Sequence, residues 1–266
     1  MVEIIQLIPV GLALAAACVA NYTDLKKRII PNKLTFPLIP IGVAFYVCWG
    51  AYQRDLMLAV SGMVGAAFAF AIGYAMWLSG GWAGGDVKLF TAFGALVPIF
   101  SPAYSRAPYS SNYPFFPITV LFNSVIVILP ILLVYTIICR ARGRGAFYEQ
   151  VKITQLKEGM IPAEVIYEKN GKIGRWSSRL GLGKPGRDRV YSNPSRAAGL
   201  TRYQVGALKK LVRAGKLSNS IKIKKGMPFA PALGAGLLIA VVYGDIYWRI
   251  VVWLTGASAQ LLTLAL

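Results

Sequence analysis

Histidine is absent from this chain, and acidic residues are scarce. Among its 266 residues there are 10 Asp and Glu against 29 Lys and Arg. Without histidine the chain cannot build an HExxH zinc site, a Ser-His-Asp triad or a Cys-His nucleophile. Its cysteines, Cys18, Cys48 and Cys139, lie in or at the end of apolar runs and lack the spacing of metal ligands. We therefore expect no metal or other cofactor, and carboxylates remain the best-supplied catalytic groups.

Apolar residues occur in long blocks. The chain is 56% hydrophobic with a mean hydropathy of +0.55, above the apolar share of ordinary soluble domains. A helix needs about 20 residues to cross the hydrocarbon core of a bilayer. Blocks near that length occupy residues 4–22, 34–51, 56–78, 86–100, 116–138 and 227–243. They predict an all-α polytopic membrane protein with about six transmembrane helices, and the apolar tail at 246–266 fits a further span or an interfacial helix.

The positive charge is concentrated between residues 140 and 226. This segment has 21 Lys and Arg against five Asp and Glu, a net charge of +16, whereas the other residues carry +3. Beside membrane spans, anionic lipid headgroups are the nearest partner for such a segment. An ordinary solvated face or the usual positive-inside signal is the alternative. We expect no nucleic-acid binding, because no aromatic stacking platform is visible.

Local signals within the basic segment predict a small α+β domain. Polar and apolar residues alternate over 163–173, on either side of Asn170-Gly171, a pair typical of a type I′ hairpin. Thr201 can cap a helix that runs through Ala214. Residues 174–194, rich in Gly, Arg and Ser, read as a linker. The predicted domain therefore interrupts the membrane protein just before its last span.

Three regions follow from these patterns. Residues 1–139 form the membrane core with the first five spans, residues 140–226 form the basic cytoplasmic domain, and residues 227–266 form the C-terminal transmembrane segment and tail. The loops that carry most Lys and Arg stay in the cytoplasm. Lys26, Lys27, Arg28 and Lys33 follow the first span and the basic segment follows the fifth, so alternating spans place both on the cytoplasmic side. The loop at 79–85 then lies on that side too.

Two aspartates lie at the cytoplasmic ends of predicted spans. The acids outside the basic segment are Glu3, Asp24, Asp55, Asp86 and Asp245. In this topology only Asp24 and Asp86 face the cytoplasmic side. Taken singly, Asp24 could pair with a neighbouring cation and Asp86 could cap a helix beside a glycine-rich linker. An acid at such a place in a membrane protein is nonetheless a candidate functional residue.

Taken together, the two aspartates suggest acid–base chemistry. Two close carboxyl groups do not both ionise readily, so one keeps a proton near neutral pH while the other acts as a base. Such a pair can deprotonate a water molecule and polarise the peptide carbonyl that the water attacks. The sequence does not bring the two residues together, since 62 positions separate them.

The surrounding motifs resemble those of a known family. Residues 24–35 (DLKKRIIPNKLT) resemble the first catalytic motif of the prepilin and preflagellin (prearchaellin) peptidases, membrane aspartyl proteases of the GxGD type. Residues 84–89 (GGDVKL) resemble their Gly-x-Gly-Asp motif, although Ala83 stands where that motif has its first glycine. Residues 227–231 (MPFAP) are similar to the start of the family's last span. The basic domain resembles, more loosely, the extension of archaeal members.

The resemblance implies an aspartyl endopeptidase of the cell membrane. It would remove the short basic leader from type IV pilin-like or archaellin precursors, with its active site facing the cytoplasm. The catalytic residues would be Asp24 and Asp86, with Gly84 and Gly85 in the loop that supports the second aspartate. Bacterial members often carry a Cys-x-x-Cys zinc loop and methylate the product. This chain lacks that pair, so we predict neither structural zinc nor methyl transfer.

Other interpretations of the same residues remain open at this point. A polytopic transporter or scaffold could use Asp24 and Asp86 to bind protons or ions. A serine–lysine peptidase could pair Lys88 with a hydroxyl such as Ser79 or Thr91. A third alternative keeps the aspartyl mechanism but cuts within substrate helices, as presenilin-like proteases do. The sequence does not reveal the precursor or the oligomeric state.

Overall fold

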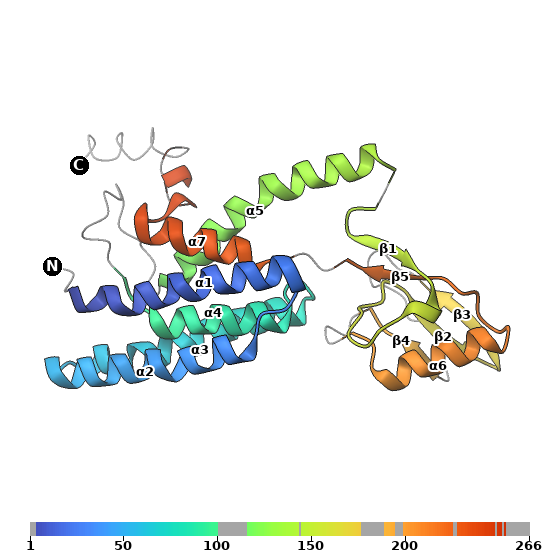
Figure 1. Ribbon diagram of the computed structural model, residues 1–266, viewed down its shortest axis with the longest axis horizontal. Helices are drawn as coiled ribbons and strands as arrows, with labels where there is room; N and C mark the ends of the chain where they lie inside the picture. The colour runs from blue at the N-terminus through green and yellow to red at the C-terminus, as the bar shows by residue number, and fades with distance from the viewer. Residues whose placement is uncertain are drawn as a thin grey trace, which may run out of the picture. The chain divides into compact units, whose positions relative to one another are not determined.

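The computed structural model describes residues 4–100, 116–143, 145–176, 189–194, 199–225, 228–247, 249–251 and 253. The chain divides into two compact units (Figure 1). The first comprises Met1–Trp77, Trp82–Leu133 and Pro228–Leu266, and the second comprises Leu78–Gly81 and Val134–Met227. The predicted loop at 101–115 and most of the tail at 246–266 lie outside the described residues.

The first unit is a bundle of apolar helices. Within the described part of the chain, four helices are long and apolar enough to cross a membrane: α1 Leu7–Lys27, α2 Asn32–Gln53, α3 Leu56–Leu78 and α5 Phe116–Ala141. A short 3-10 turn, Ile4–Gln6, precedes α1. Two shorter helices, α4 Gly84–Leu96 and α7 Ala230–Val242, have 13 residues each. A mainly helical chain with several helices able to span a membrane is thus confirmed, whereas the count of six spans stays a prediction.

Helix α4 is shorter than the span predicted at 86–100. Thirteen residues rise only about 20 Å, less than the ~30 Å of a bilayer core, so α4 cannot cross it alone. The helix ends at Leu96 because Val97 precedes Pro98, and a residue before proline disfavours the helical conformation. Val97 has left the helix with ψ at 65°.

Backbone contacts hold α4 deep inside the first unit. Its side chains from Leu89 to Leu96 are almost fully enclosed, and α4 packs against α2, α1 and α7. A Cβ on Gly42 of α2 would overlap the backbone of Ala95, and one on Gly65 of α3 would overlap that of Gly94. Glycines at these crossings let the helices touch through their backbones.

The second unit contains two small antiparallel sheets and a helix. Strand β1 (Tyr148–Val151) pairs with β5 (Ile221–Lys224), while β2 (Val165–Lys169) lies between β3 (Lys172–Trp176) and β4 (Arg189–Ser192). Helix α6 (Arg202–Arg213) buries Val205 and Leu208. A 3-10 turn, Ile153–Gln155, adds Ile153 to the same core.

Two local predictions for this unit are confirmed. Asn170 and Gly171 both have positive φ, 51° and 72°, as a type I′ turn requires, and they join β2 to β3. Thr201 caps α6 by accepting the N–H of Gln204. The predicted linker at 174–194 is wrong at both ends, because residues 174–176 belong to β3 and residues 189–192 pair with β2 as β4. No local turn signal marks β4, because its partner strand β2 is distant in sequence; the closest pair is Glu168 and Arg189.

Candidate active site

Asp24 lies in the last turn of α1. The helix ends there because Arg28 adopts a left-handed conformation, φ 56°, and its N–H bonds to the Asp24 carbonyl at 2.9 Å. Pro31 then fixes the extended entry into α2. The Asp24 side chain is 7% exposed, and its Oδ2 accepts the backbone N–H of Ala230 at 3.3 Å. A residue 206 positions away thus holds this carboxylate.

Asp86 lies in the first turn of α4. Its Oδ2 accepts the N–H of Ala83, the N-terminal cap residue of that helix, at 3.0 Å. This bond satisfies a donor that the start of a helix would otherwise leave unpaired. The side chain is 4% exposed. An anion at this end of a helix is also favoured by the helix dipole.

The structure brings the two aspartates together. Helices α1 and α4 pack against each other in the first unit, and Gly85, the neighbour of Asp86, lies against Ile30, which follows the end of α1. Each accepts a single backbone N–H, at Oδ2, among the described residues. The arrangement suits a water molecule bound between one acid and one base.

Gly84 and Gly85 form the first turn of α4, not the loop that the sequence suggested. A Cβ on Gly84 would have nothing within 4 Å, whereas one on Gly85 would meet the Cβ of Ile30 at 3.1 Å. Ile30 lies between α1 and α2, so Gly85 lets the two sequence motifs pack directly on each other. Ala83 has φ −83°, which any residue adopts, so the missing motif glycine needs no strained backbone.

Lys88 faces the first motif and not the carboxyl groups. Its Nζ donates to Oδ1 of Asn32 at 2.8 Å and lies 5.0 Å from the centre of the Phe36 ring. The candidate hydroxyl of Thr91 donates to the carbonyl of Val87. With Lys88 bonded to Asn32 and Thr91 bonded to Val87, the pairing of Lys88 with Thr91 gains no geometric support.

Two contributors to the site escaped the sequence reasoning. Ala230 supplies a backbone group, which no side-chain pattern reveals. Asn21 lies three residues before Asp24 on α1; with its amide nitrogen directed at the acceptors, it donates to the carbonyls of Ala17 at 3.1 Å and Ala230 at 2.7 Å. A polar residue on the same helix face as Asp24 was the available signal. The Trp82 ring packs in a tilted contact on Phe229, with ring centres 5.2 Å apart, just before the start of α7.

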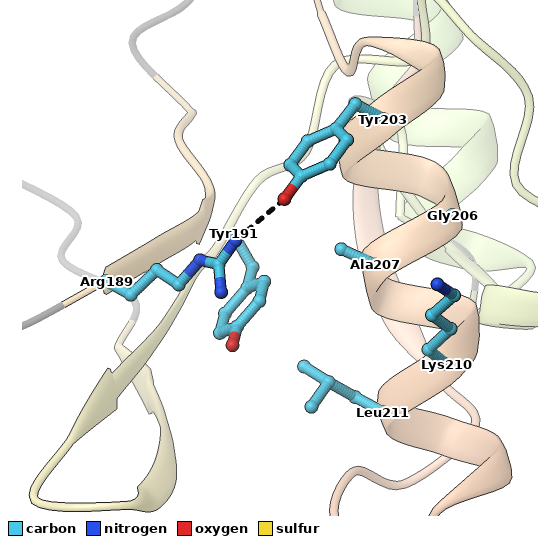
Figure 2. A pocket seen from close by; sticks show the side chains of 7 residues that line it. All are labelled: Arg189, Tyr191, Tyr203, Gly206, Ala207, Lys210 and Leu211. Atoms are coloured by element: carbon cyan, nitrogen blue, oxygen red, sulfur yellow. Dashed lines mark hydrogen bonds between the residues drawn. The ribbon is translucent and has the colours of Figure 1, made fainter.

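The second unit has a separate pocket of about 390 Å³ between β4 and α6. Figure 2 shows Arg189 extending from β4 towards Tyr203 of α6. The Arg189 Nη2 donates a hydrogen bond to the Tyr203 hydroxyl at 2.7 Å. The guanidinium also lies 5.5 Å from the ring centre of Tyr191, and Lys210 adds a second cation. A hydrogen bond to Glu168, together with burial, raises the pKa of the Tyr191 hydroxyl. That hydroxyl therefore adds no negative charge.

The first unit is thus a bundle of apolar helices, four of them long enough to span a membrane, that encloses two acidic side chains at the ends of α1 and α4. The sequence model of the type IV leader peptidase family matches residues 11–138, which include both aspartates. The chain is 31% identical to the preflagellin peptidase of Methanococcus maripaludis, with 58% of this chain and 72% of that protein aligned. It is 26% identical to the prepilin peptidase EppA of Methanothermobacter thermautotrophicus, over 91% of this chain and 96% of that protein.

The chain therefore belongs to the type IV leader peptidase family and is a membrane protease. Family membership favours protease activity over the transporter or scaffold alternative. It also supports leader-peptide cleavage as the class of reaction.

Proposed function

We propose that the chain is an aspartyl endopeptidase that removes the short basic leader from type IV pilin-like or archaellin precursors. The observation that carries the proposal is the placement of Asp24 and Asp86, which are both enclosed and lie at the ends of α1 and α4, two helices that pack against each other. Relatives named prepilin and preflagellin peptidases support the substrate class.

The two carboxyl groups would divide the chemistry between them. The ionised carboxylate takes a proton from water as the water oxygen bonds to the scissile carbonyl carbon, and the protonated carboxyl donates a hydrogen bond to the carbonyl oxygen. The C–N bond then breaks, and a proton passes to the departing amine. The N–H groups of Ala83 and Ala230 hold the two side chains in position throughout.

The direct test is cleavage of a preflagellin precursor by the purified full chain in detergent. Asp24→Asn and Asp86→Asn should each abolish cleavage, because an amide can neither take nor give the proton. Lys88→Met is the matched control, since it removes a charge two residues from Asp86 without touching either carboxyl group. Wild-type cleavage by either aspartate variant would refute the catalytic pairing of Asp24 and Asp86 (the dyad). A loss of cleavage in Lys88→Met as severe as in Asp86→Asn would point back to a lysine mechanism.

We place the site at the cytoplasmic face, together with the basic domain at 140–226. The Lys and Arg residues that follow α1 support this orientation. A membrane-impermeant amine reagent should label lysines of that domain, such as Lys157 and Lys216, in inverted vesicles and leave them unlabelled in intact cells. Labelling in intact cells would reverse the orientation.

We also assign an anionic lipid headgroup to the pocket between β4 and α6. Two cations beside tyrosine rings suit a phosphate attached to an apolar tail. Short-chain phosphatidylglycerol, titrated into the full chain in detergent, should bind more weakly when Arg189 and Lys210 are both changed to Gln. The control is Lys216→Gln, which removes one exposed charge outside the pocket. If phosphatidylcholine bound as tightly as phosphatidylglycerol, or if Lys216→Gln weakened binding as much as the double variant, the pocket would not be a specific site for an anionic headgroup.

A further inference from the structure

The first turn of α7 reaches the candidate active site through a backbone group. Ala230 is the first residue of α7, and its N–H donates to Oδ2 of Asp24. The N–H groups of Ala232 and Leu233 both bond to the carbonyl of Phe229, and Pro231 has no N–H. Among residues 230–233, only the N–H of Ala230 therefore points out of the helix, and the Asp24 carboxylate accepts it.

This contact offsets an unfavourable location for a carboxylate. Asp24 lies near the C-terminal end of α1, where the helix dipole disfavours negative charge. The N-terminus of α7 presents the opposite end of a dipole and a free donor to the same group. Asp86 needs no such help, because it already lies at a helix N-terminus. Both carboxyl groups therefore lie at a helix N-terminus, Asp86 at that of its own helix α4 and Asp24 at that of α7.

Asn21 fixes the position of that donor. With its amide nitrogen directed at the acceptors, Asn21 donates to the carbonyl of Ala230 at 2.7 Å while Asp24 accepts the N–H of the same residue. Side chains three positions apart on α1 therefore hold both polar groups of one α7 residue. Gly234, one turn further along α7, leaves the space that the Asn21 amide occupies, since a Cβ there would overlap the amide.

We propose that Asn21 is a positioning residue for Asp24: it anchors the first turn of α7 so that the Ala230 N–H orients the carboxylate, and Gly234 provides the room for this contact. The proposal rests on the proposed catalytic role of Asp24. It assigns a function to a segment beyond residues 11–138, the stretch that the family model matches. It concerns the orientation of a catalytic group and not the binding of substrate.

Two substitutions disturb the contact from opposite sides. Asn21→Asp keeps the shape but replaces the donating amide with oxygens that repel the Ala230 carbonyl, and Gly234→Ala displaces the amide with a methyl group. The matched controls are Thr23→Val and Gly11→Ala. Among the described residues, the Thr23 hydroxyl bonds within α1, to the carbonyl of Ala20, and a Cβ on Gly11 would meet nothing within 4 Å.

The measurement is steady-state cleavage of a preflagellin precursor, with kcat and KM determined separately on folded full-chain enzyme. Both variants should lower kcat about 10- to 100-fold, the range for a lost hydrogen bond to a charged group, and should change KM less than threefold. Because both act on one contact, the double variant should lose little more than the worse single variant. The controls should keep wild-type kcat.

The outcomes separate the two proposals. If the variants melt earlier but retain wild-type kcat per folded molecule, Asn21 has only a structural role and the inference is wrong. Losses of kcat that multiply in the double variant would also contradict a shared contact. If Asp24→Asn is itself active, the proposed dyad fails and the positioning role fails with it, whereas an inactive Asp24→Asn beside fully active Asn21 variants overturns the inference alone.

Discussion

Replacing Gly85 with alanine tests how tightly the two sequence motifs pack. The added Cβ would lie 3.1 Å from the Cβ of Ile30 and 3.4 Å from its Cγ1 and Cδ1, whereas carbon atoms prefer about 3.5–4.0 Å. Ile30 is enclosed, so the first turn of α4 must move by a few tenths of an ångström. The same change at Gly84 meets open space and provides the matched control.

The magnitude follows from two opposing contributions. Alanine in place of glycine stabilises a helix by about 0.5–1 kcal/mol, and overpacking in an enclosed site costs about 1–3 kcal/mol. Gly84→Ala should therefore raise the free energy of unfolding slightly, and Gly85→Ala should lie about 1–3 kcal/mol below it. Because Asp86 follows directly, the displaced turn should also reduce kcat several-fold, given that misplacement by about 1 Å can cost roughly 100-fold.

Thermal unfolding and precursor cleavage in the same detergent measure both effects. The comparison between the two alanine variants removes the contribution of helix propensity, which they share. If Gly84→Ala were as damaging to stability as Gly85→Ala, the packing of Gly85 on Ile30 would not explain the motif. Unchanged kcat in a destabilised Gly85→Ala would show that the position of Asp86 tolerates this displacement.

Two further substitutions probe single residues. Ala83→Gly restores the family's motif glycine, and because φ at this position is already −83°, cleavage should stay within twofold of wild type; a large gain would mean that the turn needs glycine for another reason. Thr201→Ala removes the cap of α6 and should destabilise the second unit by about 1 kcal/mol, seen as earlier loss of amide-exchange protection in α6; no change would show that the Gln204 side chain caps the helix alone.

Local signals in the sequence predicted the elements whose causes are local. The hairpin at Asn170-Gly171 depends on two residues that accept positive φ, and the start of α6 depends on the Thr201 cap. Both were predictable because the chemistry lies within four residues of the feature. The long helices followed from the length of their apolar runs.

Features that depend on distant partners were not predictable in the same way. Strand β4 exists because β2 offers it a pairing edge, so a Gly- and Arg-rich stretch that reads as a linker forms a strand. The proximity of Asp24 and Asp86 depends on the crossing of α1 and α4. The Ala230 donor is a backbone group, and only the fold decides which N–H of a helix is left to meet a carboxylate.

The enclosure of α4 has a consequence for how the bilayer influences catalysis. Leu89, Phe90, Phe93 and Leu96 are at most 1% exposed, while α3 and α5 present large side chains outward. The helix that carries Asp86 is therefore enclosed by its neighbouring helices, and changes in acyl-chain length would reach it through the helices that pack on it, α1, α2 and α7, and through the glycine crossings with α2 and α3. Hydrophobic mismatch would be absorbed by the tilt of the outer helices, which leaves the dyad insulated from the thickness of the membrane around it.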